Sequence, residues 1–227
     1  MMITDEKTES ESWSKTKVDR KSAISPHLSV LTDIYQEDVN IAVWQQDLSD
    51  DLISCSLKLL EQYPNLKAVL TVTPSDVYEQ LIQQLDEFAD ANKFCLHISL
   101  IVDMFCTLFD LKATGLRLVS LDRAMCPQFH VDKIPCRLVT TFTGCTTQWL
   151  DNNVIDRSKL GAGNQGLPDE ESGLLQSHND INRLSVGDVA LLKGEGWFKN
   201  EGGGLVHRSP NLINENSRLL LTLDFID

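Results

Sequence analysis

The chain has 227 residues, of which 20 are Lys or Arg and 33 are Asp or Glu, so its formal net charge is −13. A surface of that charge repels phosphate backbones, which argues against a nucleic-acid partner. The first twelve residues contain no apolar segment of the kind that directs secretion, so we expect a cytoplasmic protein whose six cysteines are reduced.

The first half of the sequence is predicted to be a flexible tail followed by a mainly helical annex. Residues 1–22 are charged and rich in Ser and Thr, so they cannot bury enough apolar surface to offset the entropy of ordering. Residues 23–115 contain three helical patterns, at 51–63, 74–88 and 93–111. They also contain one short β-branched run, at 66–72. We expect this annex to support another domain.

The longest apolar stretch lies within the annex, from Phe94 to Phe109. It is interrupted by His97 and Asp103. It is also shorter than the roughly 20 residues that a helix needs to cross a bilayer. We therefore predict a buried core helix and no membrane partner.

The sequence pattern changes at Leu116, where helical patterns give way to short apolar or alternating runs. These runs are LRLVSLD, QFHVD, CRLVTTFTG, VALLKG, GLVH and RLLLTLDFI, with Gly-rich turns between several of them. Repeated short strands of this kind indicate a sandwich or barrel. We therefore predict an α+β chain with a β-rich domain over residues 116–227. The polar stretch 151–185 is long enough to serve as a lid or to contact a substrate.

The densest signal for a site is the segment Cys126-Pro-Gln-Phe-His130-Val-Asp132. In an extended segment His130 and Asp132 project to the same face, because side chains alternate with a period of two. An imidazole and a carboxylate side by side are good ligands for a divalent first-row metal. The alternative interpretation is a hydrogen-bonded His–Asp pair at the end of a strand.

The order of motifs further along the chain favours the metal. A Gly-Asp turn and a buried strand follow at 187–192, then His207, and Arg218 stands eleven residues after that histidine. This order resembles the double-stranded β-helix (jelly-roll) oxygenases that use Fe(II) and 2-oxoglutarate, particularly the prolyl-hydroxylase-like branch. The resemblance implies that His130, Asp132 and His207 bind iron and that Arg218 binds the distal carboxylate of 2-oxoglutarate. A solvent-facing arginine at a strand end is the alternative for Arg218.

The sequence departs from the oxygenase pattern at one position. Many members of that family place a Ser or Thr two residues after the arginine, and here that residue is Leu220. The next hydroxyl on the same face belongs to Thr222. The assignment of the co-substrate therefore depends on fewer residues than the assignment of the metal.

A second resemblance covers nearly the whole chain and introduces zinc as a rival metal. The phrases FHVDKIPCRLVTTFTGCTTQWL and VALLKGEGWFKNEGGGLVHRSPNL are similar to an uncharacterised bacterial family of unknown function, whose members are sometimes encoded beside zinc metallochaperone GTPases. This implies an alternative function, a non-catalytic metal-binding protein in zinc homeostasis with a possible partner there. A thiolate site of Cys126, His130 and Cys136 and a cupin-like sensor are further alternatives.

Overall fold

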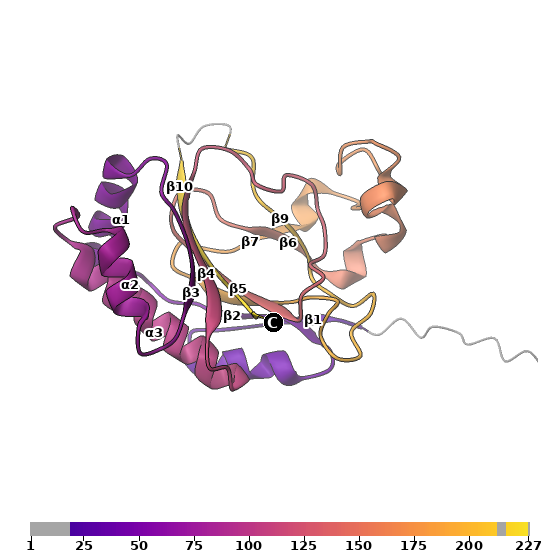
Figure 1. Cartoon of the computed structure of the whole chain (residues 1–227). Helices are drawn as coiled ribbons and strands as arrows, with labels where there is room; N and C mark the ends of the chain where they lie inside the picture. The colour runs from indigo at the N-terminus through magenta and orange to yellow at the C-terminus, as the bar shows by residue number, and fades with distance from the viewer. Residues whose placement is uncertain (1–18, 213–216, 227) are drawn as a thin grey trace, which may run out of the picture.

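The computed structural model describes residues 19–212 and 217–226, which form two β-sheets, one lying over the other (Figure 1). The larger sheet has seven strands, in the order β1 (Lys21–Ser25), β2 (Val39–Trp44), β8 (Val189–Lys193), β5 (Cys136–Thr143), β10 (Arg218–Asp224), β4 (Thr114–Leu121) and β3 (Lys67–Val72). Within the described residues β1 and β2 pair in parallel, and the other neighbours pair antiparallel. The smaller sheet has the antiparallel order β7 (Ile181–Arg183), β6 (Gln148–Leu150) and β9 (Val206–Arg208).

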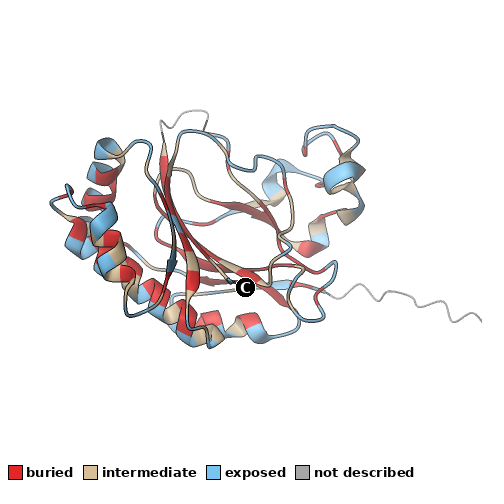
Figure 2. Cartoon of the chain, in the orientation of Figure 1, coloured by how far each residue is buried: buried red, intermediate tan, exposed pale blue. Residues whose placement is uncertain are grey.

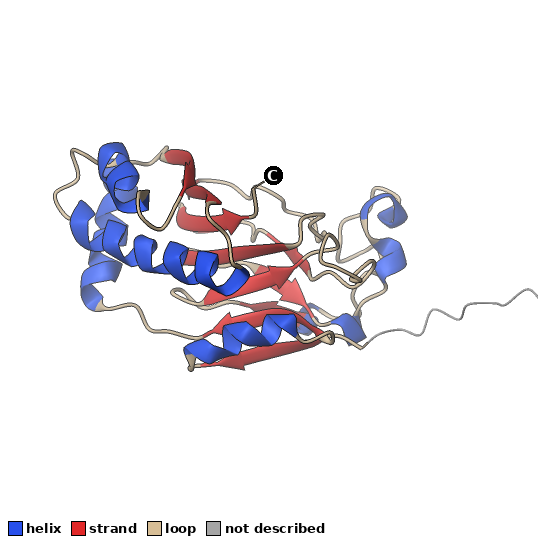
Figure 3. Cartoon of the chain, turned by 60° about the horizontal axis from the view of Figure 1, so that its bottom comes forward, coloured by secondary structure: helices blue, strands red, loops and turns tan. Residues whose placement is uncertain are grey.

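Helices cover the face of the larger sheet that points away from the smaller one (Figures 1 and 3). They are the 3₁₀ helix η1 (Leu28–Tyr35) and the α-helices α1 (Asp50–Gln62), α2 (Val77–Gln84) and α3 (Ala91–Phe109). The Ser49 side chain caps α1 by accepting a hydrogen bond from the Leu52 amide, and two aspartates in the first turn complement the helix dipole. The helices bury the side that faces the sheet and expose the other side (Figure 2). The exposed side includes the apolar residues Leu57 of α1 and Leu100 of α3.

The main hydrophobic core lies between these helices and the sheet. Along α3, Phe94, Ile98, Val102 and Phe105 recur at helical spacing and are fully buried. The ring of Phe94 meets that of Phe142 on β5 edge to face, with centroids 4.8 Å apart. Among the described helices α3 is long and apolar enough to cross a membrane by length and composition. Its packing on the sheet matches the predicted core helix.

A second, smaller core fills the space between the two sheets. It contains Val139, Leu192 and Leu220 from the larger sheet and Trp149 from the smaller one. Side chains on β10 alternate, so Leu219, Leu221 and Leu223 face the helices, while Leu220 faces the smaller sheet. Arg218 and Thr222 lie two residues before and after Leu220, so they also point into the space between the sheets.

The coarse prediction of a mixed helix-and-strand fold with a large sheet is confirmed, whereas the jelly-roll topology stays a prediction. Strands contribute more to the segment 23–115 than expected, because β1, β2 and β3 all belong to the larger sheet. β4 begins at Thr114 and crosses the predicted boundary at residue 115, so the division into domains also stays a prediction. Residues 1–18 of the predicted tail lie outside the described residues. Lys21 and Ser22, also assigned to that tail, belong to β1.

The stretch 151–180 folds into four short 3₁₀ helices and packs against the smaller sheet. These are η2 (Asn152–Val154), η3 (Arg157–Lys159), η4 (Gly161–Asn164) and η5 (His178–Asp180). A backbone bridge joins Ile155 to Leu175, and both side chains enter a third apolar cluster with Phe129 and Val206. This segment therefore forms a packed cap on the strand that carries His207.

Candidate metal centre

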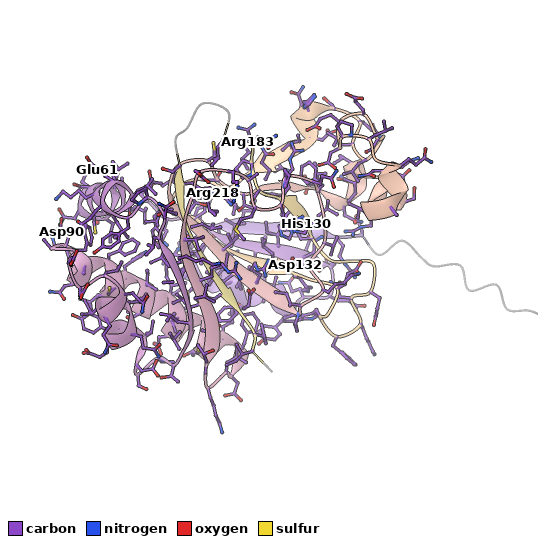
Figure 4. All side chains as sticks on the ribbon, turned by 45° about the horizontal axis from the view of Figure 1, so that its top comes forward. Glu61, Asp90, His130, Asp132, Arg183 and Arg218 are labelled. Atoms are coloured by element: carbon purple, nitrogen blue, oxygen red, sulfur yellow. The ribbon has the colours of Figure 1, made fainter. Side chains whose placement is uncertain are left out.

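The three residues predicted to bind metal lie together. Figure 4 labels two of them, His130 and Asp132, which lie close to each other. His130 pairs with His207 of β9 through two backbone hydrogen bonds of 3.0 Å, which bring the two rings to a centroid distance of 4.6 Å. The Asp132 carboxylate lies 3.8 Å from Nε2 of His130 and 3.6 Å from Nε2 of His207. One possible ligand atom from each residue lies within 4.8 Å of the others, so a single ion could contact all three.

Backbone carbonyls orient both imidazoles for metal binding. Nδ1 of His130 lies 3.0 Å from the Gln128 carbonyl oxygen, and Nδ1 of His207 lies 3.2 Å from that of Leu205. A neutral ring in such a contact carries its proton on Nδ1 and donates it to the carbonyl, which leaves the Nε2 lone pair free. Burial lowers the pKa of His207 to about 4, so that ring is neutral at physiological pH.

An arginine fixes the carboxylate of the cluster. Arg137 on β5 donates from Nη1 to Oδ2 of Asp132 at 2.9 Å. The same guanidinium donates from Nε and Nη2 to the two carboxylate oxygens of Asp224, at 2.7 and 3.0 Å. This bidentate pair holds the arginine in one orientation. Asp132 therefore has one oxygen held by Arg137, while its other oxygen faces His130.

A partly open cavity lies beside the cluster, and Arg218 lies in its wall. The Arg218 side chain is only 1% exposed, and burial lowers its pKa to about 10, which still leaves it charged at neutral pH. It donates from Nη1 to the Cys145 carbonyl at 3.3 Å and from Nη2 to the Ser209 hydroxyl at 2.9 Å, while its Nε has no partner. No carboxylate pairs with Arg218 within residues 19–212 and 217–226. A buried cation without a counter-ion is costly, so this wall of the cavity is suited to an anionic ligand.

The hydroxyl that contacts Arg218 belongs to Ser209, which lies outside β10. Leu220 occupies the position where many oxygenases have Ser or Thr, and it contributes an apolar part of the cavity wall. Ser209 lies two residues after His207, and its hydroxyl contacts the arginine from the opposite sheet. No short-range sequence pattern predicts this contact, because Ser209 follows β9 of the smaller sheet and Arg218 begins β10 of the larger one.

The thiolate site considered from the sequence receives no support from the positions of its residues. Cys136 packs in the core on the helical side of the sheet, where burial raises the pKa of its thiol, and so it lies away from the two histidines. Within the described parts of the chain, no cluster of metal-ligating side chains includes Cys126 or Cys136. Arg208, the residue after His207, is paired with Asp169 and Glu170.

The glycine-rich segment 194–204 supports the ligand segment and does not resemble a phosphate loop. A Cβ on Gly194 would lie 2.1 Å from the carbonyl oxygen of Ile134, and one on Gly204 would lie 2.4 Å from the Val131 side chain. The Glu195 amide donates to the backbone carbonyl of Asp132 at 2.9 Å. These glycines therefore permit a close backbone approach that holds the Asp132 segment in place.

Comparisons with known proteins identify the family of this chain and several solved structures that it resembles in fold. The family model described as "Protein of unknown function (DUF1826)" matches residues 25–224. A search of curated proteins found no match.

Solved structures with a similar chain path include three bacterial proteins. A prolyl-4-hydroxylase from Pseudomonas putida is 11% identical, with 87% of this chain and 96% of that chain covered and a TM-score of 0.42. HygX from Streptomyces hygroscopicus, solved with iron bound, is 10% identical, with 87% and 85% covered and a TM-score of 0.46. AviO1 from Streptomyces viridochromogenes is 15% identical, with 83% and 90% covered and a TM-score of 0.41. Similarity at this level does not transfer an activity, so the function has to be inferred from the side chains.

Proposed function

This chain belongs to the DUF1826 family, whose function is unknown, and we propose from its site that it is an Fe(II)- and 2-oxoglutarate-dependent oxygenase with a double-stranded β-helix fold. One observation carries the proposal. A His–Asp–His cluster and a buried arginine without a carboxylate partner among the described residues line a single cavity or lie beside it. The cluster suits a divalent metal, and the arginine suits an anion that reaches the metal.

The donor set fits iron. His130, Asp132 and His207 provide two neutral nitrogens and one carboxylate, which is the two-histidine, one-carboxylate set that leaves other coordination positions open. Fe(II) held there would activate dioxygen, which is the oxidant for both 2-oxoglutarate and the C–H bond of the substrate. The chain's own part is to hold the ligands, to orient the co-substrate and to keep the cavity dry. Water is excluded by the apolar part of the cavity wall, which consists of Val139, Leu192 and Leu220.

Arg218 fits the carboxylate of 2-oxoglutarate that lies farther from the metal. Its Nε lacks a partner and its Nη2 is directed at Ser209, so a carboxylate could accept from both the guanidinium and the hydroxyl. Pairing with the co-substrate would neutralise a buried charge. One carboxylate is enough for that gain, and a ligand that also reached the metal would need a second acid group at its other end, as a dicarboxylate has.

A non-catalytic zinc protein remains the alternative, because zinc also accepts histidine and carboxylate ligands. That alternative needs the same three ligands but gives Arg218 no role. The unpartnered Nε of Arg218 therefore favours the oxygenase.

The metal assignment is tested by the metal content of protein purified without oxygen. We expect close to one iron per chain, and the His130→Ala and His207→Ala variants should lose it. His27→Ala, at an exposed histidine, is the matched control and should keep it. Iron retained in both site variants would overturn the assignment, and tightly held zinc in its place would support the homeostasis alternative.

The co-substrate assignment is tested by titrating 2-oxoglutarate into the iron-loaded protein and recording the melting temperature. Ligand at a hundred times its dissociation constant should stabilise the fold by about 2.7 kcal/mol. Arg218→Met should abolish this shift, and Ser209→Ala should weaken binding about tenfold, because a hydrogen bond in this charged network is lost. Arg183→Met, at an exposed arginine on β7, should behave like the parent. An equal shift in the Arg218→Met protein would contradict the assignment.

A further inference from the structure

A second hollow, lined by three basic side chains, lies on the inner face of the larger sheet next to the metal cavity. Lys67 of β3, Arg117 of β4 and Arg123, two residues after β4, line this space of about 860 Å³, which we call the cationic hollow. All three side chains belong to residues that are not buried, and within the described residues none makes an ion pair or a side-chain hydrogen bond. One acid, Asp122, also lines the hollow. What distinguishes these three cations is that they line one hollow in a chain whose net charge is −13.

Strand register places two of these cations on the same face of the sheet. Lys67 lies opposite Val119, and Arg117 lies opposite Val69, so the two basic residues are diagonal neighbours on β3 and β4. Val119 belongs to the core between the sheets, which shows that this face is the inner one. Val69 is 54% exposed, so the smaller sheet does not cover this part of the inner face.

The cationic hollow is one strand away from the metal cavity. In the pairing of β10 with β4, Thr222 lies opposite Arg117 and Leu220 lies opposite Val119. Thr222 and Leu220 line the metal cavity, while Arg117 and Val119 line the hollow. Neighbouring strands are about 4.8 Å apart, so the two spaces adjoin. Met125 lines both of them, in the segment that leads to His130.

We propose that the cationic hollow binds a carboxylate or phosphate group of the substrate and thereby directs the rest of that molecule toward the metal cavity. The cations lie beside the cavity, and no acid of the described residues forms an ion pair with them. One face of the hollow is open to solvent. An anionic small molecule would gain two or three charge-assisted hydrogen bonds there. The oxidation of that molecule rests on the proposed oxygenase function, whereas binding of the anion does not.

The binding step is tested on metal-free protein with inorganic phosphate and malonate as probes. NMR signals of the arginine side chains would be followed during each titration. We expect saturable shifts of the Arg117 and Arg123 signals, and the stronger of the two probes identifies the preferred acid group. Arg117→Glu should weaken binding at least tenfold. Lys112→Glu, an exposed lysine before the other end of β4, should leave it unchanged. Absent shifts, or equal affinity in the Arg117→Glu protein, would overturn the proposal.

The substrate step is tested with the iron-loaded protein by measuring 2-oxoglutarate consumption in the presence of small carboxylic acids and phosphate esters. Each acid is paired with its neutral ester or alcohol. We expect only anionic members to stimulate consumption, and Lys112→Glu protein to respond as the parent does. Stimulation by neutral compounds alone would overturn the proposed substrate class. Phosphate binding at the hollow in a protein that binds neither iron nor 2-oxoglutarate would overturn the oxygenase function and leave the anion site supported.

Discussion

Arg137 connects two carboxylates that would otherwise be independent, because its guanidinium donates to both Asp132 and Asp224. The bidentate contact with Asp224 fixes the arginine, and the fixed arginine then limits how Asp132 can turn. A carboxylate held by one oxygen presents the other to the metal. Arg137 therefore acts as a positioning residue, since it donates to a proposed ligand.

We expect Arg137→Met to weaken iron binding by about 10- to 100-fold, which is the usual cost of removing a group that orients a metal ligand. The measurement is a competition titration of Fe(II) against a chelator of known affinity. Arg137→Lys keeps the charge but loses the fork that contacts both carboxylates, so it should recover only part of the affinity. Full affinity in the Met variant would mean that Asp132 is oriented by the backbone alone.

At the scale of single elements, the sequence was most informative where a regular period continued over many residues. The pattern of α3 predicted a helix at 93–111, and the structure places it at Ala91–Phe109. The period of two placed His130 and Asp132 on one side, as found. The contact of Ser209 with Arg218 was not predictable in this way, because it depends on how two sheets face each other. β1 was missed because five residues at a sheet edge carry too short a pattern.

The helix α3 also gives the fold a dependence on pH that is separate from the metal centre. His97 on α3 packs edge-on against Phe142, its Nε2 has no partner, and burial lowers its pKa below the usual 6.5. At a pH between 6.5 and the lower pKa that His97 has in the folded protein, the unfolded chain binds a proton that the folded chain does not. This contribution to stability is therefore complete above pH 6.5 and decreases as the pH falls.

We expect metal-free protein to lose stability below pH 6.5 by up to about 1.4 kcal/mol per pH unit on account of His97. His97→Leu should be less sensitive to pH over that range, whereas His27→Leu, at an exposed position, should follow the parent. Urea unfolding at pH 5.0, 6.0 and 7.5 provides the comparison. Identical slopes in the parent and the His97→Leu protein would show that this histidine does not titrate differently on folding.

At the scale of the whole molecule, the larger sheet joins the two halves of the sequence. The strands β1, β2 and β3 come from the first half, and they flank strands from the second half on both sides. The main core likewise combines Phe94 and Phe105 of α3 with Leu219 and Leu221 of β10. The proposed metal ligands all come from the second half. The second half therefore depends on the helices of the first half, which cover the outer face of its strands.

This dependence predicts that residues 116–227 do not fold alone. Such a fragment would begin inside β4 and would expose the apolar faces of β5 and β10, which the helices now cover. We expect the fragment to aggregate and to bind no iron, and a chain of residues 19–227 to unfold in one cooperative step. Urea unfolding can follow the tryptophans, since Trp44 lies in the first half and Trp149 and Trp197 lie in the second. Two separate transitions, or a soluble fragment that binds iron, would instead identify residue 115 as a true domain boundary.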